Sequence, residues 1–428
     1  MAIDRQWAMA ITSFGVLLLL ACFVYGRILE LNPFGFGNVR VLFWADGASA
    51  WDLPFGDSAS YPEWRPLAYL TLWLPYRWFH VDYLHAHHVI NLLLWTGCAW
   101  LVWKIVYRLT HTSAPALLAA AVVVTDQRAV VLVTVLEHAN SMACFFGLIA
   151  LLIDISARDQ RLSRLRWIGL SLLLLASGLS KEYGLAFTGA VAVSSLLERR
   201  RDVATAAIAA GTMYALLRIT FSGGASSGLC RGSAYFFTAR DVCFDGVHPA
   251  VVTQAAYNVV ATAVGSILPG VFAFEGQIGI APRRVVTSGV WLAAAALGWW
   301  KGPTPTRVTL LVVAFNAALS FMLYGERNQV VALCAVGIAA GVGLAVANAA
   351  VLTSARLRPV RATGVAVLLV LLAAHAINTR NLISFEVADS RLLDPCDTLR
   401  SDPPIDPAFV KQIKTAYAMP NPDCTPGR

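Results

Sequence analysis

The chain has 428 residues, of which 57% are hydrophobic and only 14% are charged. Soluble globular domains carry about 25% charged residues, so this composition excludes a soluble enzyme and a disordered scaffold. The net charge of +8 comes from basic residues between apolar runs, which is not the footprint of a nucleic-acid-binding protein. A helix needs about 20 apolar residues to cross a bilayer, and the apolar runs leave room for roughly ten or more crossings. The sequence therefore predicts an all-α polytopic membrane protein.

The first half of the chain alternates apolar runs with two long polar segments. The run at 7–25 is long enough to span and has no clear cleavage site, so we interpret it as an uncleaved first helix with a cytoplasmic N-terminus. Segments 27–84 and 222–256 are predicted to be external loops. An aromatic stretch at 68–79 is too short to span and is predicted to lie along the membrane interface. The remaining predicted helices cover about 85–107, 114–125, 139–156, 166–179, 183–197 and 203–221.

The second half carries apolar runs near 257–275, 287–300, 308–324, 329–353 and 362–378. Cytoplasmic loops are enriched in Lys and Arg, and the last basic cluster sends the final helix outward. One run, 257–275 or 287–300, is therefore expected not to span fully, which leaves about 11 transmembrane helices in a membrane domain at 1–380 and an external tail at 381–428. The basic clusters that define the predicted inner face are Lys104 with Arg108; Arg158, Arg161, Arg164 and Arg166; Arg199, Arg200 and Arg201; and Arg356, Arg358 and Arg361.

The eight cysteines fall into two groups of four. One group lies within apolar helices, where cysteine behaves as a small hydrophobe: Cys22, Cys98, Cys144 and Cys334. The other group lies in the second external loop and the tail: Cys230, Cys243, Cys396 and Cys424. These four pair as two disulfides if both segments face an oxidising compartment, and the alternative is four unpaired thiols.

The first external loop is rich in acidic and aromatic side chains. Its carboxylates are Asp46, Asp52, Asp57 and Glu63. The alternative to a functional role is that these side chains are simply solvated. The histidines that follow, His85, His87 and His88, have a spacing that spreads them around a helix axis. We therefore expect histidines at the membrane interface and not a metal site.

Three short motifs, in order across about residues 40–335, resemble GT-C glycosyltransferases. The first is Arg65-Pro66-Leu67, an aromatic segment and His88-x-x-Asn91-Leu-Leu-Leu; the second is Leu179-Ser180-Lys181-Glu182; the third is Tyr324-Gly325-Glu326-Arg327-Asn328. The chain is most similar to the O-mannosyltransferases that carry tetratricopeptide repeats and to their bacterial relatives. It departs from that pattern at Asp46-Gly47, where the family has paired aspartates, at Glu137-His138-Ala139-Asn140, where it has Gly-Arg-x-Asp, and at Trp64, where it has Tyr before Arg-Pro-Leu. No tetratricopeptide repeats follow the membrane domain.

The resemblance implies a GT-C-like bundle that passes a sugar from a polyprenyl phosphate to a periplasmic glycan, lipid or protein. The acceptor hydroxyl then needs a carboxylate general base. The first loop, where the family keeps its catalytic acid, implies Asp46, with Asp52 and Asp57 as alternatives. Arginine suits the phosphate leaving group, which implies Arg65 and Arg327, with Lys181 as a point charge. Residues expected to contact the acceptor or to support the site are Glu63, His88, Asn91, Glu137, His138, Glu182 and Glu326.

Structural alternatives stand beside these roles. Ionisable residues at a break between apolar segments usually face a cavity or each other, so Lys181-Glu182 and Glu326-Arg327 are alternatively plain salt bridges. Glu137 and His138 are alternatively helix-capping residues. A divalent cation is compatible with the first loop, although Asp46 and Asp52 alone are a thin ligand set.

Other functions also stay open at this point. An O-antigen ligase or polymerase relies on Arg and His in a later loop, and segment 222–256 offers only Arg231, Arg240 and His248. A lipid-linked sugar flippase is expected to show internal repeats, and none is evident. An inactive GT-C homologue is a further alternative. The Ala, Leu, Val and Arg usage suits a GC-rich bacterium, which predicts the inner membrane.

Overall fold

The computed structural model describes residues 2–30, 65–79, 83–134, 138–158, 160–221, 282–320, 329–353 and 358–390, with 256, 259–260 and 262–263. This described part is helical and contains no strand. Its helices that are long and apolar enough to cross a bilayer are Trp7–Glu30, His85–Thr110, Ala139–Ser156, Arg201–Phe221, Val330–Thr353 and Thr363–Phe385. The predicted all-α membrane class is therefore confirmed, while the total of about 11 spans stays a prediction.

Helices in the first half follow the predicted order closely. They are α1 (Ala2–Tyr25), η1 (Gly26–Glu30), α4 (Pro66–Phe79), α5 (Tyr83–Thr110), α6 (Ser113–Val124), α7 (Ala129–Thr134), α8 (Ala139–Ser156), α9 (Arg164–Ser180), η4 (Glu182–Gly184), α10 (Leu185–Leu197) and α11 (Arg201–Phe221). The bounds of α8 are those predicted from its apolar run.

Helices in the second half are α14 (Pro282–Lys301), η6 (Thr304–Thr306), α15 (Arg307–Leu319), α16 (Val330–Thr353) and α17 (Arg358–Ser390). The apolar run at 287–300 lies within α14, and most of the run at 257–275 lies outside the described residues. Helix α17 continues to Ser390, so the first residues of the tail expected from 381 are helical.

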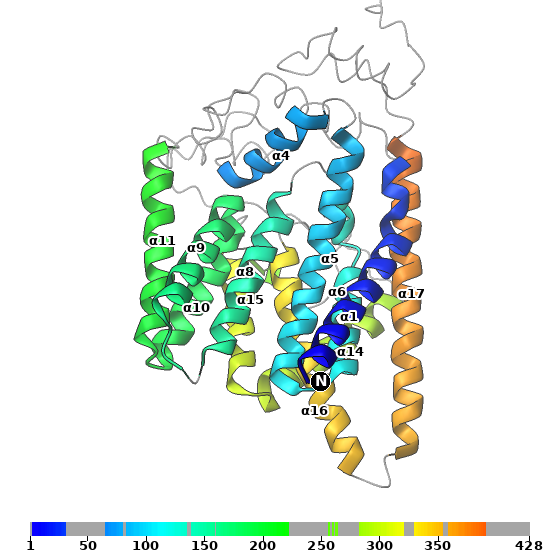
Figure 1. The fold of residues 1–428 in the computed structure, drawn as a ribbon. Helices are drawn as coiled ribbons and strands as arrows, with labels where there is room; N and C mark the ends of the chain where they lie inside the picture. Colours follow the sequence, from blue (N-terminus) through cyan, green and yellow to red (C-terminus); the bar gives the residue numbers. More distant parts are fainter. Residues whose placement is uncertain are drawn as a thin grey trace, which may run out of the picture.

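The helices run up and down between two ends of the bundle (Figure 1). Short connections make α5 and α6, α8 and α9, and α10 and α11 neighbouring pairs. Helix α4 lies across one end, and the connections that carry the basic clusters lie at the other end (Figure 1). We call these the α4 end and the basic end. The clusters at the end of α5, between α8 and α9 and between α10 and α11 therefore share one end of the bundle, and the side of the membrane that this end faces stays a prediction.

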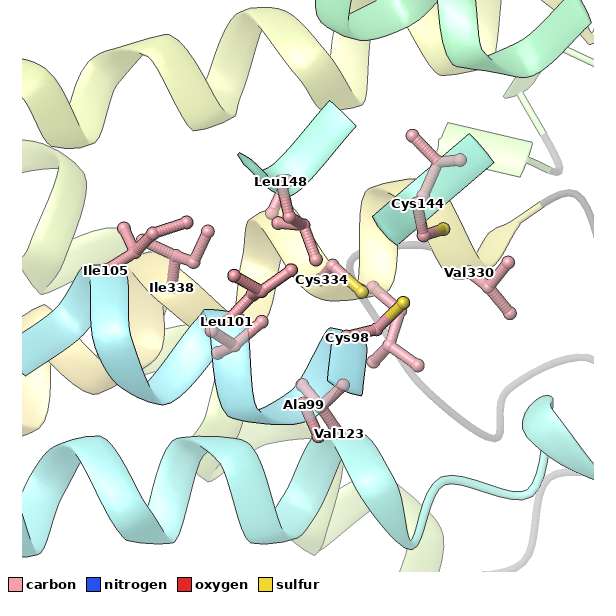
Figure 2. Close-up of a cluster of buried hydrophobic side chains, with 14 of the residues drawn as sticks. Cys98, Ala99, Leu101, Ile105, Val123, Cys144, Leu148, Val330, Cys334 and Ile338 are labelled. Atoms are coloured by element: carbon pink, nitrogen blue, oxygen red, sulfur yellow. The ribbon is translucent and has the colours of Figure 1, made fainter. Parts of the chain in front are cut away.

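The core of the bundle forms around α16, which packs against α5, α6, α8, α14 and α15. Glycines permit the closest of these approaches, because a side chain at Gly298 or Gly343 would overlap a carbonyl oxygen of the facing helix. Figure 2 shows α5, α8 and α16 contributing Cys98, Cys144 and Cys334 to one buried cluster. These three cysteines behave as the small hydrophobes that were predicted.

A buried ion pair stabilises the turn between α6 and α7. The Arg128 guanidinium donates from Nε to Asp126 Oδ1 at 2.8 Å and from Nη2 to Asp126 Oδ2 at 3.0 Å. Burial raises the pKa of the Asp126 carboxyl, but the Arg128 charge and hydrogen bonds outweigh burial and the net pKa lies below its ordinary value. The carboxylate is therefore ionised and its charge is balanced inside the protein.

The same turn fastens the first and last described helices to the core. The Tyr25 hydroxyl of α1 donates to the carbonyl of Asp126 at 2.9 Å. The Thr379 hydroxyl of α17 donates to the carbonyl of Thr125 at 2.7 Å, and His375 Nε2 lies 4.0 Å from Asp126 Oδ2. Helix α17 packs against α1 at the edge of the bundle, and each of the two helices donates a hydrogen bond to this turn.

Candidate functional site

Helix α4 covers the ends of α5, α8 and α9 (Figure 1). It is the aromatic segment that was expected to lie along the interface. Tyr69, Leu72 and Tyr76 bury one face of the helix, whereas Trp78 on its last turn is 70% exposed. Arg65 directly precedes the helix and is only 3% exposed, and its carbonyl accepts a hydrogen bond from the Tyr69 amide at 3.0 Å. The helix start thus fixes Arg65 at the end of the bundle.

The break between α9 and α10 and the last turn of α11 both meet Arg65, at the carboxylate of Glu182. Glu182 begins η4 in this break, where the extended backbone of Lys181 ends α9. Arg65 Nε lies 3.6 Å from Glu182 Oε2, and Arg218 Nη1 donates to Glu182 Oε1 at 3.4 Å. Arg218 comes from the last turn of α11 and also donates to the Tyr214 hydroxyl at 2.7 Å.

The Glu182 cluster, defined as Arg65, Lys181, Glu182 and Arg218, places three basic side chains near one carboxylate. Burial raises the pKa of the Glu182 carboxyl, but Arg65, Lys181 and Arg218 outweigh burial and hold the net pKa below its ordinary value of 4.5. Glu182 is therefore ionised at neutral pH. The four members are thus three cations and one carboxylate gathered at the same place. Arginine forks match phosphate oxygens, so the cluster is a candidate site for a bound phosphate.

A histidine pair lies beneath α4, between α5 and the start of α8. The rings of His87 and His138 stack with their centroids 3.6 Å apart. His138 Nδ1 lies 3.3 Å from the Thr71 hydroxyl of α4, and His88 Nδ1 lies 2.9 Å from the carbonyl of Val133. These contacts join α4, α5, α7 and α8 close to the surface where α4 meets the bundle.

This geometry refines one expectation and corrects another. His87 and His88 are buried inside the bundle, because α5 turns them toward α7 and α8, and their level in the membrane stays a prediction. His138 stands at the N-cap of α8, but its side chain makes no capping hydrogen bond and faces α4 and α5 instead. Asn91, one turn beyond His87 on α5, is also buried.

The structure brings together part of the predicted site. Arg65, Lys181 and Glu182 form one cluster, and His88, Asn91 and His138 lie on neighbouring elements at the same end. Glu182 is paired with arginines from two other segments, which is more than the local Lys181-Glu182 salt bridge that was the structural alternative. The other predicted residues lie outside the described part: Asp46, Asp52, Asp57, Glu63, Glu137, Glu326, Arg327, Cys230, Cys243, Cys396 and Cys424.

Sequence reasoning gave no role in the site to Arg218, His87 or Tyr214. A detectable signal exists for Arg218, because an ionisable residue inside a long apolar helix usually faces a cavity or a partner. His87 carried no such signal, since only the packing of α5 on α8 shows that its ring meets His138.

Metal binding stays a prediction for the first loop. Within the described residues, no group of three or more His, Cys, Asp and Glu side chains is arranged to hold a metal ion. Asp46 and Asp52 fall outside those residues.

Comparison with known proteins finds no matching family model and no matching curated protein. The function therefore has to be argued from the site.

Proposed function

We propose that this protein is a membrane glycosyltransferase of the GT-C class, which transfers a sugar from a polyprenyl-phosphate donor to an acceptor at the α4 end. The observation that carries the proposal is the Glu182 cluster, in which Arg65 and Arg218 from distant segments meet the Glu182 carboxylate beside Lys181. The cluster lies at the α4 end, where a phosphate at a membrane surface would be bound, and arginine forks match phosphate oxygens. The sequence motifs that contain Arg65 and Lys181-Glu182 support the same class.

The cluster has a chemical task in this reaction. When the bond between the sugar and the phosphate breaks, the phosphate leaves with the bonding electrons and gains negative charge. Preorganised cations that face the developing charge stabilise the transition state more than the ground state. Glu182 positions Arg65 through Oε2 and Arg218 through Oε1.

The acceptor side is assigned to the first loop. Residues 31–64 join η1 to Arg65, so the loop is attached directly to a member of the Glu182 cluster. Asp46 would accept the proton of the acceptor hydroxyl while its oxygen bonds to the sugar carbon, with Asp52 as the alternative base. The acceptor class is a glycan, a lipid or a protein on the same side of the membrane.

The orientation follows from the basic end. Short loops rich in Lys and Arg favour the cytoplasm, and the clusters around Arg108, Arg164 and Arg200 share one end of the bundle. We therefore infer that the N-terminus is cytoplasmic and that the α4 end faces the periplasm of a bacterial inner membrane.

Sugar transfer in reconstituted membranes tests this proposal. The donors are a panel of labelled polyprenyl-phosphate sugars, and cell-envelope extract supplies the acceptor. We expect transfer by the wild type, loss in Asp46→Asn, and a fall of about 100-fold in Arg65→Gln. Arg77→Gln is the matched control, because Arg77 lies on the same side of the bundle on α4 but contacts the ring of Trp73.

Each other outcome has a defined meaning. Transfer that survives Asp46→Asn but fails in Asp52→Asn moves the base to Asp52. Equal activity of Arg65→Gln and Arg77→Gln contradicts the phosphate site. Movement of the lipid-linked sugar across the bilayer without transfer contradicts the enzyme and favours the flippase alternative.

A further inference from the structure

The basic end carries a second concentration of positive charge, in the connections from α8 to α9 and from α10 to α11. These connections and the first turns of α9 and α11 hold seven arginines, of which five are exposed: Arg161, Arg164, Arg166, Arg199 and Arg201. We call these five residues the arginine surface. It lies at the opposite end of the bundle from the Glu182 cluster (Figure 1).

The two remaining arginines fasten the connections together. Arg200 Nη1 donates to Asp154 Oδ1 at 2.6 Å, and Arg158 forms an ion pair with Glu198. The described acidic side chains here are therefore used within the frame. As a result, none of the five arginines is in an ion pair with another described residue, and their charge faces outward.

A third contact fixes the register of the two connections. The Leu162 amide donates to Asp202 Oδ2 at 2.7 Å, which links the first connection to the start of α11. The Trp167 ring nitrogen donates to the Thr205 hydroxyl at 3.3 Å, one turn farther along both helices. The arginine surface is thus built on a rigid frame.

The backbone at Arg199 adds an independent observation. Its φ angle is +59°, in the left-handed region where glycine is the residue of least cost. The amide of Arg200 donates to the carbonyl of Ser195 at 2.8 Å, which closes the end of α10 around this residue. A glycine would suit the turn better, so the exposed guanidinium is retained at a conformational cost.

Apolar side chains place this surface at the edge of the membrane. Leu165, Ile168 and Leu172 form an exposed stripe along α9, with Leu165 80% exposed. Leu197, at the end of α10, is 76% exposed. A stripe of this kind faces lipid chains, so the arginines that flank its end lie at the level of the lipid headgroups, where long basic side chains reach phosphates.

We propose that the arginine surface binds the phosphate headgroups of anionic phospholipids in the adjacent leaflet. The arginine forks match the phosphate oxygens, and the exposed leucines contact the acyl chains. The bound lipid would hold the α8–α9 and α10–α11 connections side by side at the protein surface, in addition to the internal ion pairs that already join them. This assignment is independent of the sugar-transfer proposal, because it uses other residues at the other end of the protein.

The test measures lipid retained by the purified full chain. The protein is reconstituted in phosphatidylcholine with or without a minority of phosphatidylglycerol, and bound lipids are counted by native mass spectrometry. We expect the triple variant R161Q/R164Q/R166Q to bind phosphatidylglycerol about 100-fold more weakly, since each surface arginine contributes about fivefold. The matched control is R108Q/K301Q/R307Q, which removes three exposed charges from other connections at the same end.

Four outcomes would overturn the proposal. They are unchanged retention in the R161Q/R164Q/R166Q variant, an equal loss in the two triple variants, equal retention of phosphatidylcholine, and displacement of the lipid by inorganic phosphate at equal concentration. Arg199→Gly separates binding from folding, because it relieves the turn while it removes a charge. We expect this variant to keep or gain thermal stability and to lose about fivefold in affinity for phosphatidylglycerol.

Discussion

Asp126 and Glu182 are two carboxylates in comparable places, each in a short connection between apolar helices, and they differ in how their charge is balanced. Asp126 is matched mainly by Arg128, two residues along the chain, at a distance of 2.8 Å. Glu182 meets Arg65 at 3.6 Å and Arg218 at 3.4 Å, from two segments distant in sequence. A close local pair stabilises a turn, whereas basic side chains gathered from distant segments at longer distances are suited to holding an anionic ligand. The comparison therefore separates an architectural ion pair from a candidate binding site.

The largest expected effect is on the balanced pair. Arg128→Gln leaves the Asp126 carboxylate buried without its main partner, and we expect the free energy of unfolding to fall by about 3–5 kcal/mol. Chemical denaturation in detergent micelles measures the change. The double variant D126N/R128Q removes both charges and is expected to lose less stability than R128Q alone. Equal losses in the single and double variants would show that the pair contributes through shape and not through charge.

The second effect should appear in activity and leave the fold intact. Arg218→Gln leaves Glu182 with Arg65 and Lys181, so we expect the free energy of unfolding to change by less than about 1 kcal/mol. Sugar transfer is expected to fall by about 100-fold, because one cation facing the leaving phosphate is lost. Arg218→Lys is the control and should restore part of the rate, since it keeps the charge without the fork. A fall in stability as large as that of Arg128→Gln would erase the contrast between the two clusters.

The smallest effect concerns pH. Both carboxylates have a pKa below the ordinary value, which is 3.8 for Asp126 and 4.5 for Glu182. Each therefore contributes stability that is complete above its ordinary pKa and is lost as the pH falls through the lower pKa of the folded protein. Unfolding midpoints measured from pH 7 downward should decline below about pH 4. Glu182→Gln and D126N/R128Q should each flatten this decline, and an unchanged pH profile in both would show that other carboxylates cause it.

Much of the helix arrangement could be predicted from the sequence because apolar length is a local property. The run at 139–156 has the bounds of α8, and the aromatic stretch at 68–79 corresponds to α4. Asp126 and Arg128 were not singled out, since two charges in a short turn look like a solvated loop in sequence. The sequence of the turn does not show that α1 and α17 pack over it, where Tyr25 and Thr379 donate hydrogen bonds to its carbonyls.

The residues of the candidate site that lie in short motifs could be predicted from the sequence. The residues that join the site only through helix packing could not. Arg65 and Glu182 were singled out separately, but nothing in their spacing along the chain shows that they meet at 3.6 Å. Arg218 joins them because α11 returns to the α4 end beside α9. His87 meets His138 for a similar reason, because α5 packs on α8 and the sequence of neither helix shows this contact.

The central position of α16 has a consequence for how the protein is made. The helix lies late in the chain, yet α5, α6 and α8, which are synthesised much earlier, pack around it. Until residue 353 has emerged from the ribosome, the slot between these helices must be filled by lipid or by another chain. Gly337 and Gly341 face Val102, Val106, Ala119 and Val123 with no room for a side chain, so the late helix has to enter a space already shaped by its neighbours. Insertion of the chain into the membrane and completion of its core are therefore separate events in time.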